Sequence, residues 1–173
     1  VGTRMTRSAV FEWLSLADVA ARFSLDESGV ESLADWAERA GFRFGLDEAQ
    51  RESLGLPPLR GHTLAGSLDR LILAHALGET QDVVGGRSPV ALDAFADPAW
   101  IGAIAEVDAL LGFALRGSRE ARSVADWTGW LESLLERSLA RRDENSHEHG
   151  AILALLDRLR TAASAAGFTR AIS

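Results

Sequence analysis

The chain has 173 residues, of which 47% are hydrophobic and 25% charged, an ordinary composition for one folded domain or two small ones. It contains no cysteine, which excludes disulfides and Cys-ligated zinc, and all 18 of its basic Lys/Arg positions are arginine, which excludes a P-loop and Schiff-base chemistry. Its net charge of −7 opposes phosphate, so we expect the chain alone to bind DNA weakly.

The first half of the sequence predicts short helices that begin at capped turns. Ser8 and Ser24 stand at expected N-caps, and Ser24 opens a capping box with Glu27. Asp47 and Gln50 repeat this box before a short helix to about residue 54. The other predicted features are a turn over 18–23, a helix that ends at Gly41 and buries Val30, Leu33, Ala37 and Ala40, an extended 56–58 segment, and a helix over 63–77 with Leu64, Leu68, Leu71 and His75 on one face.

The second half predicts three longer helices after a loose segment. Residues 78–97, with Pro89 and paired glycines, form the best linker candidate. Asp97 before Pro98 is a strong helix start, and Ser123 and Asn145 are expected N-caps, the latter with Glu148 in a capping box. The residues expected to face inward are Trp100, Ile104, Val107 and Leu111, then Val124, Trp127, Leu131, Leu134 and Leu135, then Ile152, Leu155, Leu156 and Leu159.

These patterns predict an all-α fold of six to eight helices. Period-2 alternation is scarce, and no repeat of fixed period is present. We expect a single helical domain over 1–173, with possible sub-units 1–77 and 98–173 joined by 78–97. No apolar run reaches the roughly 18 residues of a membrane helix, and residues 1–7 are not followed by the apolar core of a signal peptide.

The histidines and one carboxylate are candidates for a chemical site. His147 and His149 flank Glu148, but residues two apart do not share a helix face, so we expect no metal site. His75 lies on an apolar helix face and is interpreted as a core histidine. Asp108 has no partner carboxylate at a fixed spacing, so an ion pair with an arginine is favoured over a general acid.

Two sets of side chains have the chemistry of nucleic-acid contacts. Tryptophans can stack on bases, but their helical spacing with Leu and Val favours core packing. A locally basic segment lies between residues 43 and 70, and it is either a solvated face or a DNA-facing one. The tryptophans are Trp13, Trp36, Trp100, Trp127 and Trp130, and the basic residues are Arg43, Arg51, Arg60, His62 and Arg70.

The run WAERAGFRFGLD joins two helices by an unusual turn. Gly41 ends the first helix, and the alternation of Phe42, Arg43 and Phe44 predicts both phenylalanines inward and the arginine outward. We expect Arg43 to clamp the turn through Asp47 or nearby carbonyls. The alternative is that Arg43 lines a strand channel.

The stretch 10–77 resembles the RecC-type gamma subunit of bacterial exonuclease V, the RecBCD helicase–nuclease. It carries an A-A-R-F sequence, a capped helix with a Trp, and a G-x-R-x-G-x-D turn. The sequence departs from the family at Ala17, where Pro is usual, and at Leu64, where Trp is usual. A weaker likeness runs over 110–139, and 78–101 matches poorly. The matching residues are Arg22, Phe23, Trp36, Gly41, Arg43, Gly45 and Asp47, then Leu54, Leu56, Pro57, His62, Thr63, Leu68, Arg70, Leu71 and Leu73, and later Trp127 and Leu131.

This resemblance implies an internal helical piece of an inactive, superfamily 1 helicase-like region. The chain by itself is then not an enzyme and needs no cofactor, whereas its parent complex is an ATP-dependent exodeoxyribonuclease of DNA repair and recombination. The implied partners are the rest of the RecC-type subunit, the sister helicase–nuclease subunits and, within the assembled complex, DNA, all in the bacterial cytoplasm with no membrane partner. The DNA-facing or structural candidates are Arg43, Arg60, His62 and Arg70.

Other classes of function stay open at this point. An acidic helical protein–protein interaction domain unrelated to DNA ends fits the composition. A helix-turn-helix DNA reader is opposed by the net charge of −7 and by the lack of a basic recognition helix. A metal hydrolase would require ligands that the spacing does not provide.

Overall fold

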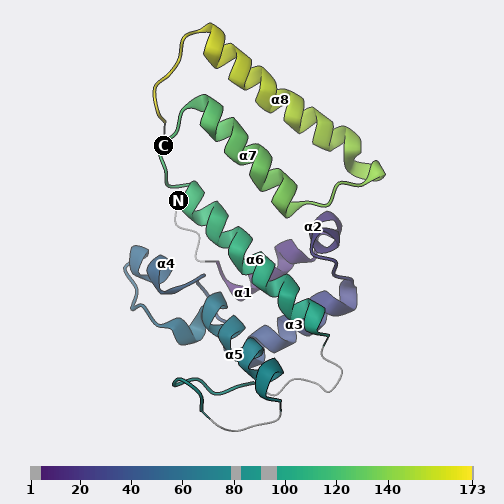
Figure 1. The fold of residues 1–173 in the computed structure, drawn as a ribbon, viewed down its shortest axis with the longest axis vertical. Coiled ribbons are helices and arrows are strands. Elements are labelled where there is room, and N and C mark those ends of the chain that lie inside the picture. Colours follow the sequence, from purple (N-terminus) through teal and green to yellow (C-terminus); the bar gives the residue numbers. More distant parts are fainter. Residues whose placement is uncertain (1–4, 79–82, 91–96, 173) are drawn as a thin grey trace. The chain divides into compact units, whose positions relative to one another are not determined.

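The computed structural model describes residues 5–78, 83–90 and 97–172 (Figure 1). Over these residues the protein has eight α-helices and two short 3-10 helices, with strand pairing limited to isolated bridges, so the all-α prediction is confirmed. The helices are α1 (Arg7–Leu14), α2 (Ala17–Arg22), α3 (Glu27–Arg39), α4 (Glu48–Ser53), η1 (Arg60–His62), α5 (Leu64–Leu77), α6 (Pro98–Gly117), α7 (Val124–Ser138), η2 (Asp143–Asn145) and α8 (Ser146–Ala165).

The chain divides into two compact units, Val1–Ala109 and Leu110–Ser173, and the division falls within α6. Below they are called unit 1 and unit 2. Part of the predicted 78–97 linker, residues 79–82 and 91–96, lies outside the described residues. The expected sub-units 1–77 and 98–173 within a single domain therefore stay a prediction.

Unit 1 has a core built from the apolar faces of α1, α3, α5 and the first half of α6. Helix α3 contacts both α1 and α5, and the rings of Trp36 and Trp100 lie 5.6 Å apart between α3 and α6. The predicted inward positions of α3 are confirmed. The buried residues of these helices include Val10, Phe11, Leu14, Val30, Leu33, Trp36, Ala37, Leu64, Leu71, Ala74, Ile101, Ile104 and Val107.

The segment 42–46 is threaded between two other stretches of backbone. Gly41 and Gly45 bracket it with φ angles of 92° and 87°, a region that other residues rarely adopt. Phe42 is fully buried and Arg43 is exposed, which confirms the predicted alternation, while Phe44 is half-buried. The bonds on one edge are Arg7 N to Arg43 O and Gly45 N to Met5 O, both 3.0 Å, and those on the other are Arg43 N to His62 O at 3.0 Å, Leu64 N to Gly45 O at 2.9 Å and Ala65 N to Leu46 O at 3.0 Å.

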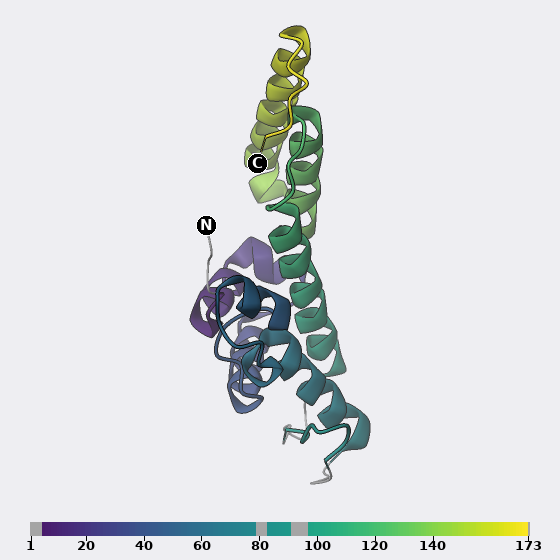
Figure 2. The ribbon, with the colours of Figure 1, turned by 90° about the vertical axis from the view of Figure 1, so that its left-hand side faces the viewer.

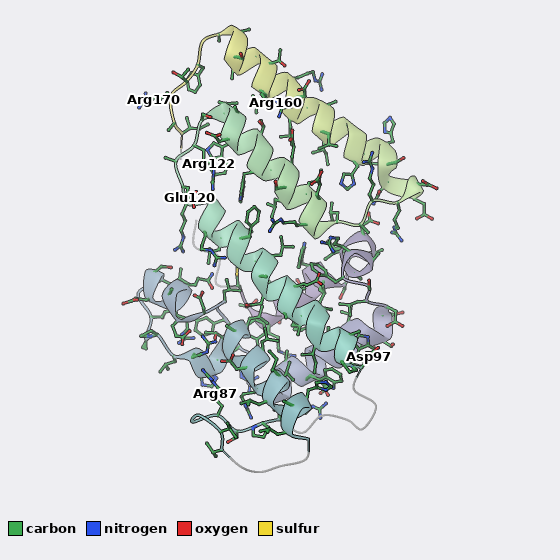
Figure 3. All side chains as sticks on the ribbon, viewed as in Figure 1. Arg87, Asp97, Glu120, Arg122, Arg160 and Arg170 are labelled. Atoms are coloured by element: carbon green, nitrogen blue, oxygen red, sulfur yellow. The ribbon has the colours of Figure 1, made fainter. Side chains whose placement is uncertain are left out.

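Unit 2 contains the second half of α6 and an antiparallel pair of helices, α7 and α8, which run side by side in both views (Figures 1 and 2). Arg122 closes the unit where α7 begins. Its backbone exchanges hydrogen bonds with Ile172, and its guanidinium lies over the rings of Trp127 and Trp130, at 5.2 and 5.5 Å from their centroids. The guanidinium also donates hydrogen bonds to the Gly117 carbonyl oxygen and, at 2.6 Å, to the carboxylate of Glu120 (Figure 3).

Three of the predicted N-caps are confirmed. The carboxylate of Asp47 accepts a hydrogen bond of 2.7 Å from Gln50 N, and the hydroxyl of Ser123 accepts one of 3.2 Å from Asp126 N. Asp97 accepts one of 2.8 Å from Ala99 N, directly before Pro98 opens α6 (Figure 3). These caps depend only on neighbouring residues, and this explains why local sequence predicted them.

Three other N-cap predictions were wrong. Thr6, not Ser8, caps α1. Ser24 has a φ of 55°, which follows from its place at the end of α2 and is incompatible with the extended backbone of an N-cap, and Asp26 caps α3 instead. Asn145 precedes α8 without a side-chain cap because its amide is used locally: it accepts from Arg142 N at 2.9 Å and donates to Ala140 O at 2.8 Å.

Several residues predicted to face inward are exposed. His75 is exposed, and the buried face of α5 passes through Ser67, Leu71 and Ala74 instead. Leu131 is 37% exposed, and three of the four inward positions predicted for α8 are exposed as well. Those positions are Ile152, Leu155 and Leu159.

The tryptophans pack as the helical spacing predicted. Trp36 is buried and the other four are half-buried. Each contacts another aromatic ring, as in the edge-to-face pairs of Trp13 with Phe23 and of Trp127 with Trp130. Base stacking by these rings stays untested.

Helix α6 is the one helix of the described residues that is long and apolar enough to cross a membrane by length and composition. Its Ile101, Ile104 and Val107 are buried within unit 1, as in a core helix. Length and composition alone therefore carry no membrane assignment.

The cap of α3 predicts a pH dependence of stability. Hydrogen bonds from Gly29 N and the Ser28 hydroxyl lower the pKa of Asp26 below its ordinary value of 3.8. A lowered pKa in the folded state stabilises the fold above the unfolded pKa, and this contribution is lost as the pH falls through the folded pKa. Asp26→Asn keeps a cap that does not titrate, so we expect the stability difference between wild type and variant to shrink from about pH 5 to about pH 2.

Urea denaturation at a series of pH values checks this expectation. A stability difference that stays constant over the whole range would contradict it.

Candidate functional site

Three arginines line a pocket of about 410 Å³ in unit 1. It brings together Arg60 and Arg70, both predicted as candidates, and adds Arg87 from the loop that follows α5 (Figure 3). Arg43 and His62, the other two candidates, do not line it. The lining residues are Arg60, Gly61, Gly66, Arg70, Gly85, Gly86, Arg87 and Ser88.

Glycines bring the walls of this arginine pocket close together. A Cβ on Gly66 would collide with the carbonyl oxygen of Arg60, so only glycine allows η1 to lie this close to α5. Gly85 and Gly86 have φ angles of 58° and 76°, as a two-residue hairpin turn requires. Backbone hydrogen bonds of 2.9 and 3.0 Å between Val84 and Arg87 close that turn and place the Arg87 side chain.

Asp69 bridges two of the three guanidinium groups. Its Oδ2 lies 2.7 Å from Arg60 Nε and 3.2 Å from Arg87 Nε. Arg60 also reaches Glu48 of α4, with Nη1 at 3.0 Å from Oε2. The hydrogen bond to Asp69, followed by the one to Glu48, raises the pKa of Arg60, so its positive charge is permanent.

Arg70 is held by backbone carbonyls. Its Nη1 donates to Ala40 O at 2.8 Å and its Nε donates to Ser88 O at 2.9 Å. Ala40 is the C-cap of α3, so the guanidinium lies at the negative end of that helix dipole. Arg70 therefore ties the end of α3 to the loop after α5.

The arginine pocket is suited to an anion. Among the described residues, Arg60 and Arg87 pair with two carboxylates, those of Glu48 and Asp69, while Arg70 binds carbonyl oxygens. The described groups thus leave one positive charge at the pocket. Guanidinium groups bind phosphate oxygens by charge-assisted, often paired, hydrogen bonds, so phosphate is the ligand that this chemistry favours.

Arg43 is exposed and does not form the expected pair with Asp47. Its Nη1 lies 4.0 Å from Glu38 Oε1, and its side chain is 56% exposed. Asp47 instead uses its carboxylate to cap α4. His62 is exposed too, with Nδ1 at 3.3 Å from Gly41 O.

The turn at 42–46 is clamped by Arg51, a member of the basic segment between residues 43 and 70. Arg51 is 5% exposed, its guanidinium lies 4.3 Å from the centroid of the Phe44 ring, and its Nε donates to Pro57 O at 2.9 Å. The spacing of Phe44 and Arg51 along the chain does not predict this contact, because Phe44 lies on the extended segment, Arg51 lies on α4, and the turn between them sets their distance.

The other residues that match the family turn have structural contacts. Gly41 and Gly45 supply positive φ angles and Trp36 is buried. Arg22 lies 3.8 Å from Glu106 and partly over the Phe23 ring, at 5.7 Å. Asp47 is the cap of α4.

The remaining candidates form no chemical site in the described part of the chain. His149 is buried and His147 is exposed. Within residues 5–78, 83–90 and 97–172, no group of three or more His, Asp or Glu side chains is arranged to hold a metal ion. Asp108 is half-buried on α6, and its predicted pairing with an arginine stays a prediction.

The fold and the site together define the class of protein: an all-helical domain that carries a pocket lined by arginines. The whole chain, residues 1–173, matches the family described as RecBCD enzyme subunit RecC fourth domain. The chain belongs to this family, and the resemblance seen in the sequence is confirmed.

Relatives from three bacteria share this similarity. The chain is 29% identical over 129 residues to RecBCD enzyme subunit RecC of Escherichia coli (strain K12), covering 72% of the chain and 11% of that protein. It is 24% identical over 84 residues to RecC of Buchnera aphidicola subsp. Acyrthosiphon pisum and 24% over 82 residues to RecC of Buchnera aphidicola subsp. Schizaphis graminum, covering 49% and 46% of the chain and 8% of each protein. The aligned part thus spans about a tenth of the length of these relatives.

The close approach at Gly66 predicts an unusual response to alanine. Gly66→Ala should destabilise unit 1 by more than about 1 kcal/mol, because the new methyl group must displace the Arg60 carbonyl. Gly102→Ala is the matched control in α6, where a Cβ meets open space, and it should stabilise by about 0.5 to 1 kcal/mol through helix propensity. Chemical denaturation measures both variants, and a stabilising Gly66→Ala would disprove the close packing.

Arg70 and Arg43 should differ in their contribution to stability. Arg70→Ala removes two charge-assisted hydrogen bonds to carbonyls and should cost about 2 kcal/mol. Arg43→Ala removes one long, exposed ion pair and should cost less than about 0.5 kcal/mol. Thermal or urea unfolding compares the two, and an equal or reversed order would contradict the structural assignment.

Proposed function

We propose that this chain is a non-catalytic helical part of a RecC subunit of the ATP-dependent exonuclease V complex. In this role it scaffolds the helicase–nuclease and guides DNA strands during double-strand break repair and recombination in the bacterial cytoplasm. Its partners are the rest of the RecC subunit, the sister subunits and, in the assembled complex, DNA. The family match over residues 1–173 supports the assignment to RecC.

The observation that carries the strand-guiding role is the arginine pocket. Arg60, Arg70 and Arg87 converge from η1, α5 and the following loop, and ion pairs or carbonyls hold each one in place. Pre-positioned guanidinium groups lose little conformational entropy when they bind a phosphate. We assign the pocket to a backbone phosphate of a DNA strand, with exposed Arg43 as a second candidate for a channel wall.

The charge of unit 1 explains why this contact belongs to the assembled complex. Residues 1–109 carry nine arginines against 17 acidic residues, a formal charge of −8. A surface of that charge repels a polyanion at long range, so neighbouring domains must supply most of the attraction. The same acid excess supports the alternative of a helical interaction domain unrelated to DNA ends.

Salt dependence of DNA binding separates the two proposals. Arg87→Gln in the assembled complex should reduce the magnitude of the slope of log affinity against log salt by about 0.7 to 0.9 for a forked DNA, because one phosphate contact is lost. Arg39→Gln is the matched control, since Arg39 also forms an ion pair with a carboxylate, that of Asp35 at 2.8 Å, but lies on α3 away from the pocket lining.

The measurement is equilibrium binding to the same fork at several salt concentrations. An unchanged slope for Arg87→Gln would remove the pocket as a phosphate contact. Equal losses for both variants would show a general charge effect rather than a site.

A further inference from the structure

Helix α8 carries an apolar face that the described residues of unit 2 leave open. Ile152, Leu155 and Leu159 are 42%, 58% and 52% exposed. Their spacing of three and then four residues places them on one side of the helix, and Ala162 continues the same row. We call these four residues the α8 apolar face.

This face is distinct from the side of α8 that packs on α7. The two buried residues of α8 are His149 and Leu156. Arg160 reaches across to α7, where its Nη1 lies 3.3 Å from Glu132 Oε1. A helix of 20 residues that buries two side chains gains little from packing, and helices in proteins depend on packing of an apolar face for their stability.

We propose that an apolar segment of the same subunit, from outside residues 1–173, packs on the α8 apolar face. This inference rests on membership of the RecC family and not on the strand-guiding role. The chain covers 11% of the Escherichia coli relative, so the parent of such a domain contains ample polypeptide to supply the segment. The Ile and Leu side chains of this face are about half exposed, and an apolar helix or strand that covered them would remove their apolar surface from water.

A second copy of the chain is a poorer occupant. Stable dimers bury about 800 Å² on each partner, far more than one row of half-exposed side chains on a single helix offers. A segment of the same subunit needs a smaller area because its effective concentration is high from the start. The size of the face therefore favours an occupant within the subunit.

A membrane surface is also a poorer occupant. Interfacial helices carry aromatic residues on the apolar face and a strongly basic polar face. Helix α8 has no aromatic residue and no lysine, and its acidic Glu148 and Asp157 would oppose anionic lipid.

Photo-crosslinking in the full-length subunit tests the proposal. The photoreactive residue p-benzoylphenylalanine replaces Leu155 in one preparation and Thr161, an exposed residue away from the face, in the control. After irradiation of the subunit alone and of the assembled complex, mass spectrometry identifies the joined peptides. We expect a several-fold higher yield at position 155 than at 161, with the partner peptide outside residues 1–173 of the same subunit.

Each other result overturns the proposal. Crosslinks to a sister subunit that appear only in the complex would assign the face to an interface between subunits. A crosslinked dimer of the subunit would assign it to a second copy. Equal yields at positions 155 and 161 would show an open face.

Hydrogen exchange measures how much the proposed contact stabilises α8. Leu155→Asp in the full-length subunit should speed hydrogen exchange of α8 amides by about tenfold or more, because a charge replaces an apolar contact. Thr161→Asp, the control on the same helix, should leave the exchange of α8 within about twofold. Similar exchange in the two variants would overturn the proposal. Neither readout involves DNA, so failure here leaves the strand-guiding proposal standing, and the reverse holds for the salt-slope experiment.

Discussion

The segment 42–46 is the constraint on which unit 1 depends, because its backbone is hydrogen-bonded on both edges. One edge bonds to Met5 and to Arg7 at the start of α1, and the other bonds to the junction of η1 and α5. Buried backbone groups must be paired, so a short extended segment inside a helical domain is stable only with partners on both sides. The positive φ angles of Gly41 and Gly45 let the backbone turn into and out of this extended segment. The start of α5 is thereby fixed, and with it the wall of the arginine pocket.

Arginine side chains connect the elements that surround this segment. Arg51 lies over the Phe44 ring, and Arg70 donates to the carbonyl oxygen of Ala40 at the C-terminal end of α3. Arg60 joins α4 to α5 through ion pairs with two carboxylates. A planar guanidinium with several donors can satisfy partners in different directions, which a lysine ammonium does less well. The same contacts hold the pocket in shape before any ligand arrives. For Arg60 and Arg70, these structural contacts are therefore compatible with the proposed binding of an anion.

Local signals predicted the helices well and the contacts between them poorly. Caps such as Asp47 and the alternation at Phe42 and Arg43 involve neighbouring residues, so the sequence contains what decides them. Arg87 was missed because a hairpin turn, set by two glycines with positive φ, carries it to the pocket. Arg51 was predicted to lie on an exposed basic face, because its aromatic partner Phe44 belongs to another element and the sequence does not reveal the contact. Periodicity showed that one face of α8 is apolar, but it does not say what covers that face.

The two units differ in how many apolar side chains they bury. Unit 1 contains 21 of the 24 buried hydrophobic residues found among the described positions, and unit 2 contains Leu110, Val124 and Leu156. Charge is divided in the same way, since residues 110–173 carry nine arginines against eight acidic residues while unit 1 holds the acid excess. Unit 2 has three buried apolar residues and an open apolar face on α8, so it gains less from burial than unit 1 does against the conformational entropy of ordering its chain. This difference agrees with the proposal that another segment of the subunit covers α8 of unit 2, whereas unit 1 has a core of its own on which a charged site can be positioned.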